Sequence, residues 1–197
     1  MRNLSAKDSF DNRVSEIEHT LLRFKQDCAM QVLASAKIIA ESFMSGNKLL
    51  ICGNGGSAAD SQHFAAEFVS SFSKNVSRPA FSAIALTTDT SFITAFSNDF
   101  SFDGVFERQV QAHGRKNDVL VAITTSGESK NCLKAVEQAK SQGMKSIAIT
   151  SVDASISSLV DVSIEIPSNN TQHIQECHMI AYHILAELVE NSIMEKG

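Results

Sequence analysis

Short apolar runs alternate with segments of helical periodicity along most of this chain, and this alternation limits the possible folds more than any other feature. The runs occupy residues 48–52, 81–86, 119–124, 146–150 and 162–166. Apolar runs bounded by turn residues are typical of strands buried on both faces. Helical patterns lie between them, at 58–72, at 92–96 continued by 105–112, and at 131–142. The alternation predicts a parallel sheet with helices on both faces.

Helical patterns also flank the alternating region. Residues 9–45 contain no proline and predict one or two helices, with Gly46 as the cap at the C-terminal end. Residues 171–195 predict a long final helix. We therefore expect an α/β sandwich over residues 46–197, preceded by an N-terminal helical arm over 1–45. Helices of this length on a small sheet commonly bury a second apolar face in a partner subunit.

Composition excludes several classes of protein. The chain has 197 residues, which is enough for one domain with a sizeable core. Its 17 basic residues are scattered and outnumbered by 22 acidic ones, so a nucleic-acid-binding face is not expected. No stretch approaches the roughly 18–20 apolar residues that a membrane span needs, and the first residues lack the apolar core of a signal peptide.

Cysteine usage indicates the compartment. The chain has four cysteines, far apart and without metal-binding spacing: Cys28, Cys52, Cys132 and Cys177. We interpret them as reduced, mostly buried thiols and therefore expect a cytoplasmic protein.

The segment 53–57 (Gly-Asn-Gly-Gly-Ser) joins a predicted strand to a predicted helix. Its glycines let backbone N–H groups approach an anion closely, and the helix N-terminus adds partial positive charge. The spacing matches neither the dinucleotide motif nor the Walker loop. Ser57 can donate to a phosphate oxygen or cap the helix, and a tight turn with a serine cap is the alternative interpretation.

A second strand-to-helix loop, at 124–129, carries four hydroxyls in six residues: Thr124, Thr125, Ser126 and Ser129. Hydroxyls and backbone amides can bind a phosphate monoester without lysine or arginine, although such a turn can also be only a capping segment. Ligands bind at the carboxyl ends of strands in sheets of this type. Two such loops therefore predict one anion site, surrounded by Ser57, Thr125, Ser126 and Ser129.

His63 and Glu67 follow the first loop and share one helix face, since they are four residues apart. An imidazole and a carboxylate at this spacing suit a divalent transition metal, whereas the alternative is a solvated surface or interface pair.

The final helix places Gln175, His178 and His183 in an otherwise apolar stretch. Gln175 and His183 lie about 12 Å apart along it. They can share one metal only if Gln175 lies at the helix entrance or the two come from different chains. His178 lies off that face, and we expect it to pack internally. His19, His113 and His173 have no evident partners.

Five segments resemble the phosphoheptose isomerases, which belong to the sugar isomerase (SIS) domain superfamily: 49–63, 85–91, 97–100, 124–129 and 174–183. The resemblance runs from about residue 15 to 194. It implies a flavodoxin-like sheet in a homotetramer whose active sites are shared between subunits. It also implies interconversion of sedoheptulose 7-phosphate and D-glycero-D-manno-heptose 7-phosphate, the first step toward ADP-heptose for lipopolysaccharide.

The resemblance further implies residue roles. Zinc ligands would be His63, Glu67, Gln175 and His183. Substrate contacts would fall at Asn54, Gly55, Gly56, Asn98, Asp99, Thr124, Thr125, Ser126, Ser129 and Gln175. Moving a carbonyl between C1 and C2 needs a base and an acid, and our hypothesis gives these roles to Glu67 and His183 through a cis-enediol. A carboxylate bound tightly to zinc is, however, a poorer base.

The chain departs from the family pattern at three places. Thr124 stands where serine is usual and keeps the hydroxyl. Ser71 stands where many members have an arginine, and Lys74 or Arg78 are the candidate substitutes. Residues 151–155 (Ser-Val-Asp-Ala-Ser) replace a usual glycine-rich loop, so the rim of the site is expected to differ.

Two non-catalytic alternatives have the same fold. A protein that associates with the DnaA replication initiator resembles this family but lacks the catalytic pair, whereas Glu67 and His183 are both present here, as are His63 and Gln175. A SIS module that senses sugar phosphates usually carries a DNA-binding domain, and the first 45 residues lack a basic recognition helix. The isomerase is therefore the favoured prediction.

Overall fold

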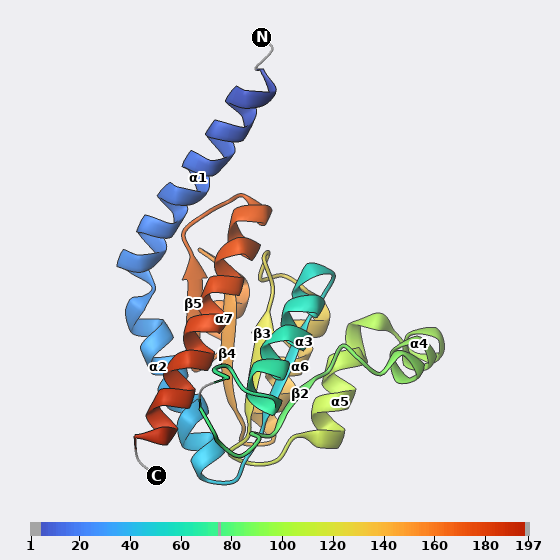
Figure 1. Ribbon diagram of the computed structural model, residues 1–197. Coiled ribbons are helices and arrows are strands. Elements are labelled where there is room, and N and C mark those ends of the chain that lie inside the picture. Colours follow the sequence, from blue (N-terminus) through green and yellow to red (C-terminus); the bar gives the residue numbers. More distant parts are fainter. Residues whose placement is uncertain (1–4, 75, 196–197) are drawn as a thin grey trace.

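Five parallel strands form a single sheet in the computed structural model, which describes residues 5–74 and 76–195. Residues 1–4 of the expected arm and 196–197 of the expected sandwich lie outside the described residues. The spatial order is β2-β1-β3-β4-β5, the flavodoxin-like order (Figure 1). The strands are β1 (Leu49–Gly53), β2 (Ala83–Ala85), β3 (Val119–Ile123), β4 (Lys145–Ser151) and β5 (Val162–Ile166). The predicted α/β fold is confirmed.

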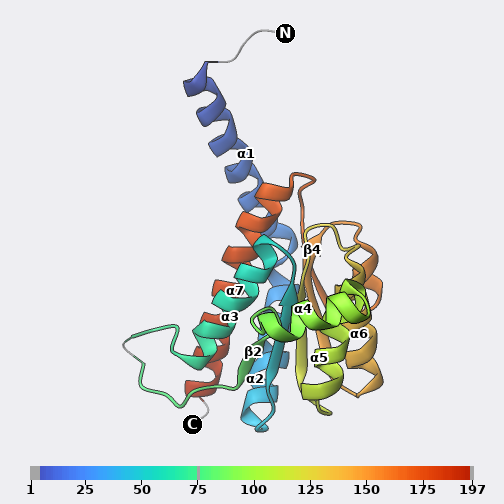
Figure 2. The ribbon, with the colours of Figure 1, turned by 90° about the vertical axis from the view of Figure 1, so that its right-hand side faces the viewer.

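Helices cover both faces of this sheet, as Figures 1 and 2 show. The helices α2, α3 and α7 pack on one face, and α5 and α6 pack on the other. Their bounds are α1 (Ala6–Asp27), α2 (Ala29–Met44), α3 (Gly56–Val69), α4 (Thr90–Asp99), α5 (Val105–His113), α6 (Lys130–Ser141) and α7 (Thr171–Met194), with short 3-10 turns at Phe102–Gly104 and Ser155–Ser158.

Alternate residues of the central strands enter two separate cores. Leu49 and Ile51 of β1 join the cluster under α2, α3 and α7, whereas Leu50 and Cys52 join the cluster under α5 and α6. Successive side chains of a strand point to opposite faces, so a strand covered on both faces must be apolar throughout. This explains the continuous apolar runs of the sequence.

The predicted N-terminal helices are two, separated at Cys28. This residue ends α1 and begins α2, and no glycine or proline marks the break. Helix α1 extends beyond the body of the molecule in Figure 1, whereas α2 contributes Val32 and Ile39 to the core beside α7. Gly46 follows α2 with φ +77°, as a residue in the left-handed conformation after a helix end. The boundary between arm and sandwich at residue 46 stays a prediction.

Two elements are shorter than the sequence patterns predict. Strand β2 has three residues, lies at one edge of the sheet and pairs only with β1. Helix α3 ends at Val69 rather than residue 72, and the buried Arg78 guanidinium donates to the carbonyls of Glu67 and Phe68 at its last turn. The side chain of Arg78 also pairs with Glu190 of α7.

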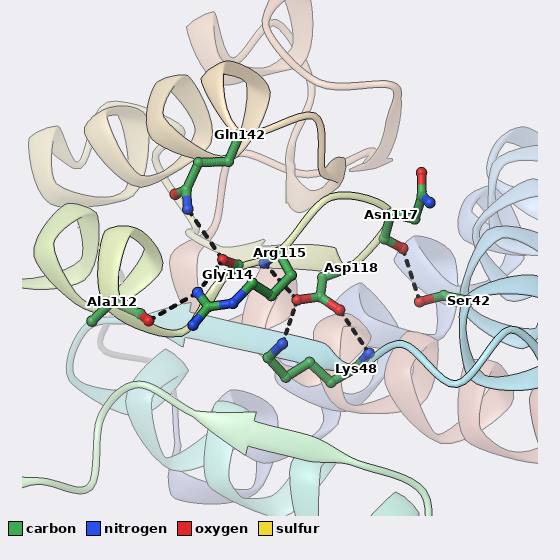
Figure 3. A network of polar contacts seen from close by, with 8 residues as sticks. All are labelled: Ser42, Lys48, Ala112, Gly114, Arg115, Asn117, Asp118 and Gln142. Carbon is green, nitrogen blue, oxygen red and sulfur yellow. Dashed lines mark hydrogen bonds and ion pairs between the residues drawn. The ribbon is translucent and has the colours of Figure 1, made fainter.

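A polar network closes the amino ends of β1 and β3, opposite the edge where ligands are expected (Figure 3). Asp118 is buried and accepts the backbone N–H groups of Lys48 (2.9 Å) and Arg115 (2.7 Å), and its carboxylate also pairs with the Lys48 ammonium. The carbonyl of Asn117 accepts the Ser42 hydroxyl of α2. These bonds fix the starts of β1 and β3 and take up the polar groups at this edge of the sheet.

Candidate active site

The two predicted anion-binding loops lie side by side at the carboxyl ends of β1 and β3. These strands are neighbours, paired from Leu49 with Val119 to Gly53 with Ile123. Asn54 and Asn131 exchange side-chain amide hydrogen bonds of 2.9 and 2.8 Å across the two loops. A Cβ at Gly53 would lie 2.8 Å from the Ile123 carbonyl oxygen, so this approach needs glycine. The sequence analysis did not identify Asn131.

The first loop turns sharply into α3. Gly55 has φ +56° and is the N-cap residue, and Gly56 begins the helix. A Cβ at Gly56 would collide with the side chain of Gln175, so α7 closes over this turn. Ser57 is buried and lies inside the first turn of the helix. The interpretation of Ser57 as the helix cap is therefore wrong, and its predicted contact with an anion stays a prediction.

The second loop is ordered by its own hydroxyls. The Thr124 hydroxyl lies 3.2 Å from that of Ser129 and accepts the backbone N–H of Gly127. Ser129 stands at the N-cap position of α6 without a side-chain capping bond, so its hydroxyl is not used as the cap. Thr125 is half-buried and Ser126 is exposed. The loop thus offers hydroxyls and the N-terminus of α6 at one place.

The departure at 151–155 packs directly against this loop. The Ser155 hydroxyl donates to the Gly127 carbonyl (3.1 Å), and the Ser155 N–H donates to the Glu128 carboxylate (3.4 Å). Gly127 has φ +68°, and a Cβ there would strike Ala154. The segment that replaces the glycine-rich loop therefore supports the hydroxyl-rich loop from behind.

Three of the predicted metal ligands converge between α3 and α7. His63 Nε2 lies 3.0 Å from Glu67 Oε1 and 3.5 Å from His183 Nε2. Each of the three residues offers a ligand atom within 4.8 Å of the others. Two imidazoles and one carboxylate, partly exposed on one side, are a donor set that zinc takes in proteins. The residues therefore fit the metal that the resemblance implies.

Gln175 does not join these three side chains by any contact described for this chain. Its amide nitrogen donates to Asp60 Oδ2 at 3.3 Å, and its side chain lies over Gly56. Gln175 is the fifth residue of α7 and so lies near the helix entrance. This position was one of the two conditions under which Gln175 and His183 could share a metal. Its role as a ligand and as a substrate contact stays a prediction.

Asp60 and Tyr182 lie behind the three converging side chains, and the sequence analysis missed both. The Tyr182 hydroxyl lies 3.0 Å from His63 Nδ1, and Tyr182 is buried. Burial raises the pKa of Tyr182 to about 12, and the negative charges of Asp60 and Glu67 add to the rise. Burial also raises the pKa of Asp60, against the hydrogen bond from Gln175 and the attraction of His63. The available signals were that Asp60 shares a helix face with His63 and that Tyr182 is the only tyrosine.

Asn98 and Asp99 lie at the end of α4, which projects beyond α5 in Figure 1. Both are exposed, and the Asn98 amide donates to the Asp99 carboxylate at 2.9 Å. Asp99 lines a cavity of about 610 Å³ together with Phe96, Phe100 and Arg108. The structure does not bring these two residues to the anion-binding loops of the same chain, and their contact with substrate stays a prediction.

The structure also shows the surroundings of four other residues considered in the sequence analysis. His178 is buried as expected, and burial lowers its pKa to about 4. Neither of its ring nitrogens has a hydrogen-bond partner among the described residues. His173 is buried, and its Nε2 has no hydrogen-bond partner among the described residues, although Glu16 Oε2 of α1 lies 3.7 Å away. Arg78 cannot replace the usual arginine, because its guanidinium is buried and paired with Glu190. Lys74 is exposed.

All four cysteines are free and buried, as predicted. Burial raises the pKa of the Cys28 thiol to about 12 and that of the Cys177 thiol to about 11, so these thiols stay protonated at neutral pH. Among the described residues, no helix is both long and apolar enough to cross a membrane.

Comparisons with known proteins agree with this fold and show the family. The SIS domain family matches residues 14–151. The phosphoheptose isomerase of Shewanella sediminis is 42% identical over 191 residues, which cover 95% of this chain and 94% of that protein. The structure of phosphoheptose isomerase GmhA from Neisseria gonorrhoeae has a TM-score of 0.89 and 36% identity, and that of Francisella tularensis has 0.91 and 32%. Both cover 95% of this chain and 100% of theirs.

Proposed function

Because this chain belongs to the phosphoheptose isomerase family of SIS-domain proteins, we propose that it interconverts sedoheptulose 7-phosphate and D-glycero-D-manno-heptose 7-phosphate. Two observations carry this function. The two anion-binding loops lie side by side at the carboxyl ends of β1 and β3, and His63, Glu67 and His183 converge between α3 and α7, the helices that close over the first loop. The non-catalytic interpretation as a DnaA-associating protein is not favoured, since the relatives are isomerases and both members of the catalytic pair are present.

The loops suit the phosphate end of the substrate. Backbone N–H groups at the starts of α3 and α6 carry partial positive charge, and Ser126 and Ser129 can donate hydroxyl hydrogen bonds. Asn54 and Asn131 hold the two loops together, so the donors are positioned before the substrate arrives. The phosphate would thus anchor the sugar with its carbonyl toward α3 and α7.

Glu67 and His183 suit the proton transfers. In the forward direction the base removes a proton from the carbon beside the carbonyl, while the acid protonates the carbonyl oxygen, which gives a cis-enediol. Return of the proton to the neighbouring carbon completes the isomerisation, and the two groups exchange roles in reverse. We assign the base to Glu67 and the acid to His183.

His63, Glu67 and His183 would hold zinc, with Gln175 as the proposed fourth ligand. When bound there, zinc supplies Lewis-acid polarisation of a carbonyl oxygen. Glu67 has two carboxylate oxygens, and Oε1 is the one that faces His63. A ligand role for Glu67 weakens its basicity, so measurements of activity must be paired with measurements of metal content.

We also propose a homotetramer with shared active sites. Helices α1, α2 and α7 line an apolar groove of about 510 Å³ that includes Leu21, Leu33, Ile184 and Leu188. Apolar surface of this kind marks an interface. Asn98 and Asp99 on the projecting helix α4 would reach the site of a neighbouring subunit, which reconciles their predicted role with their position.

The expected setting is the cytoplasm, ahead of ADP-heptose and lipopolysaccharide synthesis. The support for this compartment is the set of four free, buried thiols, which need no oxidising environment. No substrate other than a small sugar phosphate is proposed, and the acidic net charge of −5 supports the expectation that nucleic acid is not a partner.

The decisive assay incubates the purified protein with ketose 7-, 6- and 5-phosphates and follows aldose formation. We expect turnover of sedoheptulose 7-phosphate. Glu67→Gln and His183→Gln should each lower kcat about 10²–10⁴-fold while remaining folded, because each removes one proton-transfer group. Glu187→Gln, an exposed carboxylate of the same helix α7, is the matched control and should keep full activity.

Zinc content decides between the two roles of each residue. A lower kcat with zinc retained supports proton transfer, whereas a loss restored by excess zinc supports a ligand role alone. Near-normal turnover in both variants would contradict the mechanism and favour the non-catalytic alternative, which is then tested by binding to the replication initiator.

A further inference from the structure

Asp60 and Tyr182 are neighbours of His63 that take no part in the proposed proton transfers. The Tyr182 hydroxyl lies 3.0 Å from His63 Nδ1, on the side of the ring opposite the Nε2 atom that faces Glu67 and His183. The negative charge of Asp60 also acts on this hydroxyl and helps to raise the pKa of Tyr182. Asp60 and Tyr182 are both buried, so water does not compete for these groups.

The role of Nε2 fixes the direction of the hydrogen bond between Tyr182 and His63. When Nε2 gives its lone pair to a metal, the proton of the neutral ring lies on Nδ1, and the Tyr182 oxygen accepts from it. The proton of the Tyr182 hydroxyl can then turn toward Asp60, whose carboxylate also accepts from the Gln175 amide at 3.3 Å.

We propose that Tyr182 and Asp60 are positioning residues that hold the His63 ring in the tautomer and orientation needed for Nε2 to bind a divalent transition metal with Glu67 and His183. This inference rests on the metal site of the proposed function. A ligating histidine needs its other ring nitrogen to donate to a fixed acceptor, and such partners raise metal affinity. Here the neutral Tyr182 hydroxyl is the acceptor of the Nδ1 proton, and the negatively charged Asp60 carboxylate lies beyond it.

Packing alone does not account for this arrangement. The centroid of the Tyr182 ring lies 5.4 Å from the ring centroid of Phe64 and 5.5 Å from that of His63. A phenylalanine at 182 would keep both ring contacts. Only the hydroxyl distinguishes tyrosine from phenylalanine at this position. We call the contacts that link Asp60, Tyr182 and Nδ1 of His63 the relay. Tyr182→Phe therefore separates the effect of the relay from the effect of core packing.

The test is the affinity for zinc itself, which does not depend on isomerase activity. Wild type and Tyr182→Phe are stripped with a chelator, and Zn²⁺ binding is measured by competition with a chromophoric chelator near pH 7.5. We expect Tyr182→Phe to bind zinc about 10- to 100-fold more weakly. Asp60→Asn breaks the other end of the relay and should weaken binding in the same direction. Ser61→Ala is the matched control, because it removes a buried hydroxyl from the same helix α3 outside the relay.

Cobalt(II) gives a second readout, since its visible spectrum reports the geometry of the ligands. We expect an altered spectrum in Tyr182→Phe and an unchanged one in Ser61→Ala. Zinc affinity and cobalt spectrum of Tyr182→Phe equal to wild type would overturn the relay while leaving the metal site intact. A wild type that binds no zinc at micromolar concentration would overturn both the relay and the metal site, although turnover of sedoheptulose 7-phosphate could still stand. If Tyr182→Phe does not fold, Asp60→Asn decides by the same criteria.

Discussion

At the level of single residues, we propose that hydroxyls and backbone amides recognise the phosphate. Arg78, a candidate for the usual arginine, is buried and paired with Glu190, so it is not free to bind a ligand. Ser71 donates to the Ser73 carbonyl and contributes no charge. In this proposal the phosphate is held by neutral donors and by the N-terminal ends of α3 and α6, so the affinity for it should be sensitive to each hydroxyl.

We predict that the double substitution Ser126→Ala and Ser129→Ala raises KM about 10²–10⁴-fold and changes kcat much less. Hydrogen bonds to a charged group are worth about 1.5–3 kcal/mol each, and the phosphate is bound equally in the ground and transition states. Steady-state kinetics with sedoheptulose 7-phosphate measures both constants. Ser141→Ala, at the far end of α6, is the control, and an unchanged KM in the double variant would refute the assignment.

The buried His178 predicts a pH dependence of stability. Its pKa is lowered to about 4 in the folded state, below the usual value near 6.5. Between these values the unfolded chain binds a proton that the folded chain does not, so stability falls as the pH drops from about 6.5 to 4. The loss from this residue alone is about 3 kcal/mol, since one pKa unit corresponds to about 1.4 kcal/mol.

His178→Gln should remove this part of the acid dependence. The measurement is the free energy of unfolding in urea at pH 7 and pH 4.5 for wild type and variant. The exposed His113→Gln variant is the matched control and should keep the wild-type slope. Equal slopes for His178→Gln and wild type would show that His178 does not titrate as its burial requires.

Sequence patterns located the site residues that repeat along one element, and they missed those that depend on contacts between elements. His63, Glu67 and His183 are ligand types at helical spacing or in an apolar helix, and the structure brings them together. Asn131 has no signal of its own, because its importance arises only from the pairing with Asn54. The position of Gln175 over Gly56 likewise follows from how α7 crosses α3.

At the level of elements, the strands buried on both faces were predictable because their apolar runs are continuous. The break at Cys28 was not, since neither glycine nor proline marks it and α2 is placed by its packing on α7 and β5. The end of α3 was also missed. Residues 70–74 and 76–81 leave the helix because Arg78 and Glu190 fix this segment against α7, through bonds that no local pattern reveals.

We predict that Glu190→Gln lowers the free energy of unfolding by about 3–5 kcal/mol, because it leaves the buried Arg78 charge without its partner. Denaturant unfolding monitored by circular dichroism measures the change. Asp11→Asn breaks the exposed pair with Lys7 in α1 and serves as control, with little change expected. A loss for Glu190→Gln as small as that of the control would show that the pair does not anchor α7.

At the level of the whole molecule, the arm and the projecting α4 leave apolar surface that one chain does not cover. Leu22, Met30 and Leu33 are 61%, 73% and 51% exposed on α1 and α2, next to the groove under α7. Phe100 beside α4 is 76% exposed. Monomeric proteins rarely expose neighbouring apolar side chains to this extent, so we propose that further copies of the chain bury both surfaces.

We predict that the wild type is a tetramer by light scattering at micromolar concentration and that Leu33→Glu shifts it to smaller species. A carboxylate in the apolar groove must be desolvated when subunits meet, and it has no partner there. Ser141→Glu adds the same charge on the exposed side of α6 and should leave the tetramer intact. Since residues of more than one chain are proposed to complete each site, kcat should fall with the tetramer fraction in Leu33→Glu. A wild type that is a fully active monomer would contradict shared sites and leave Asn98 and Asp99 without a route to substrate.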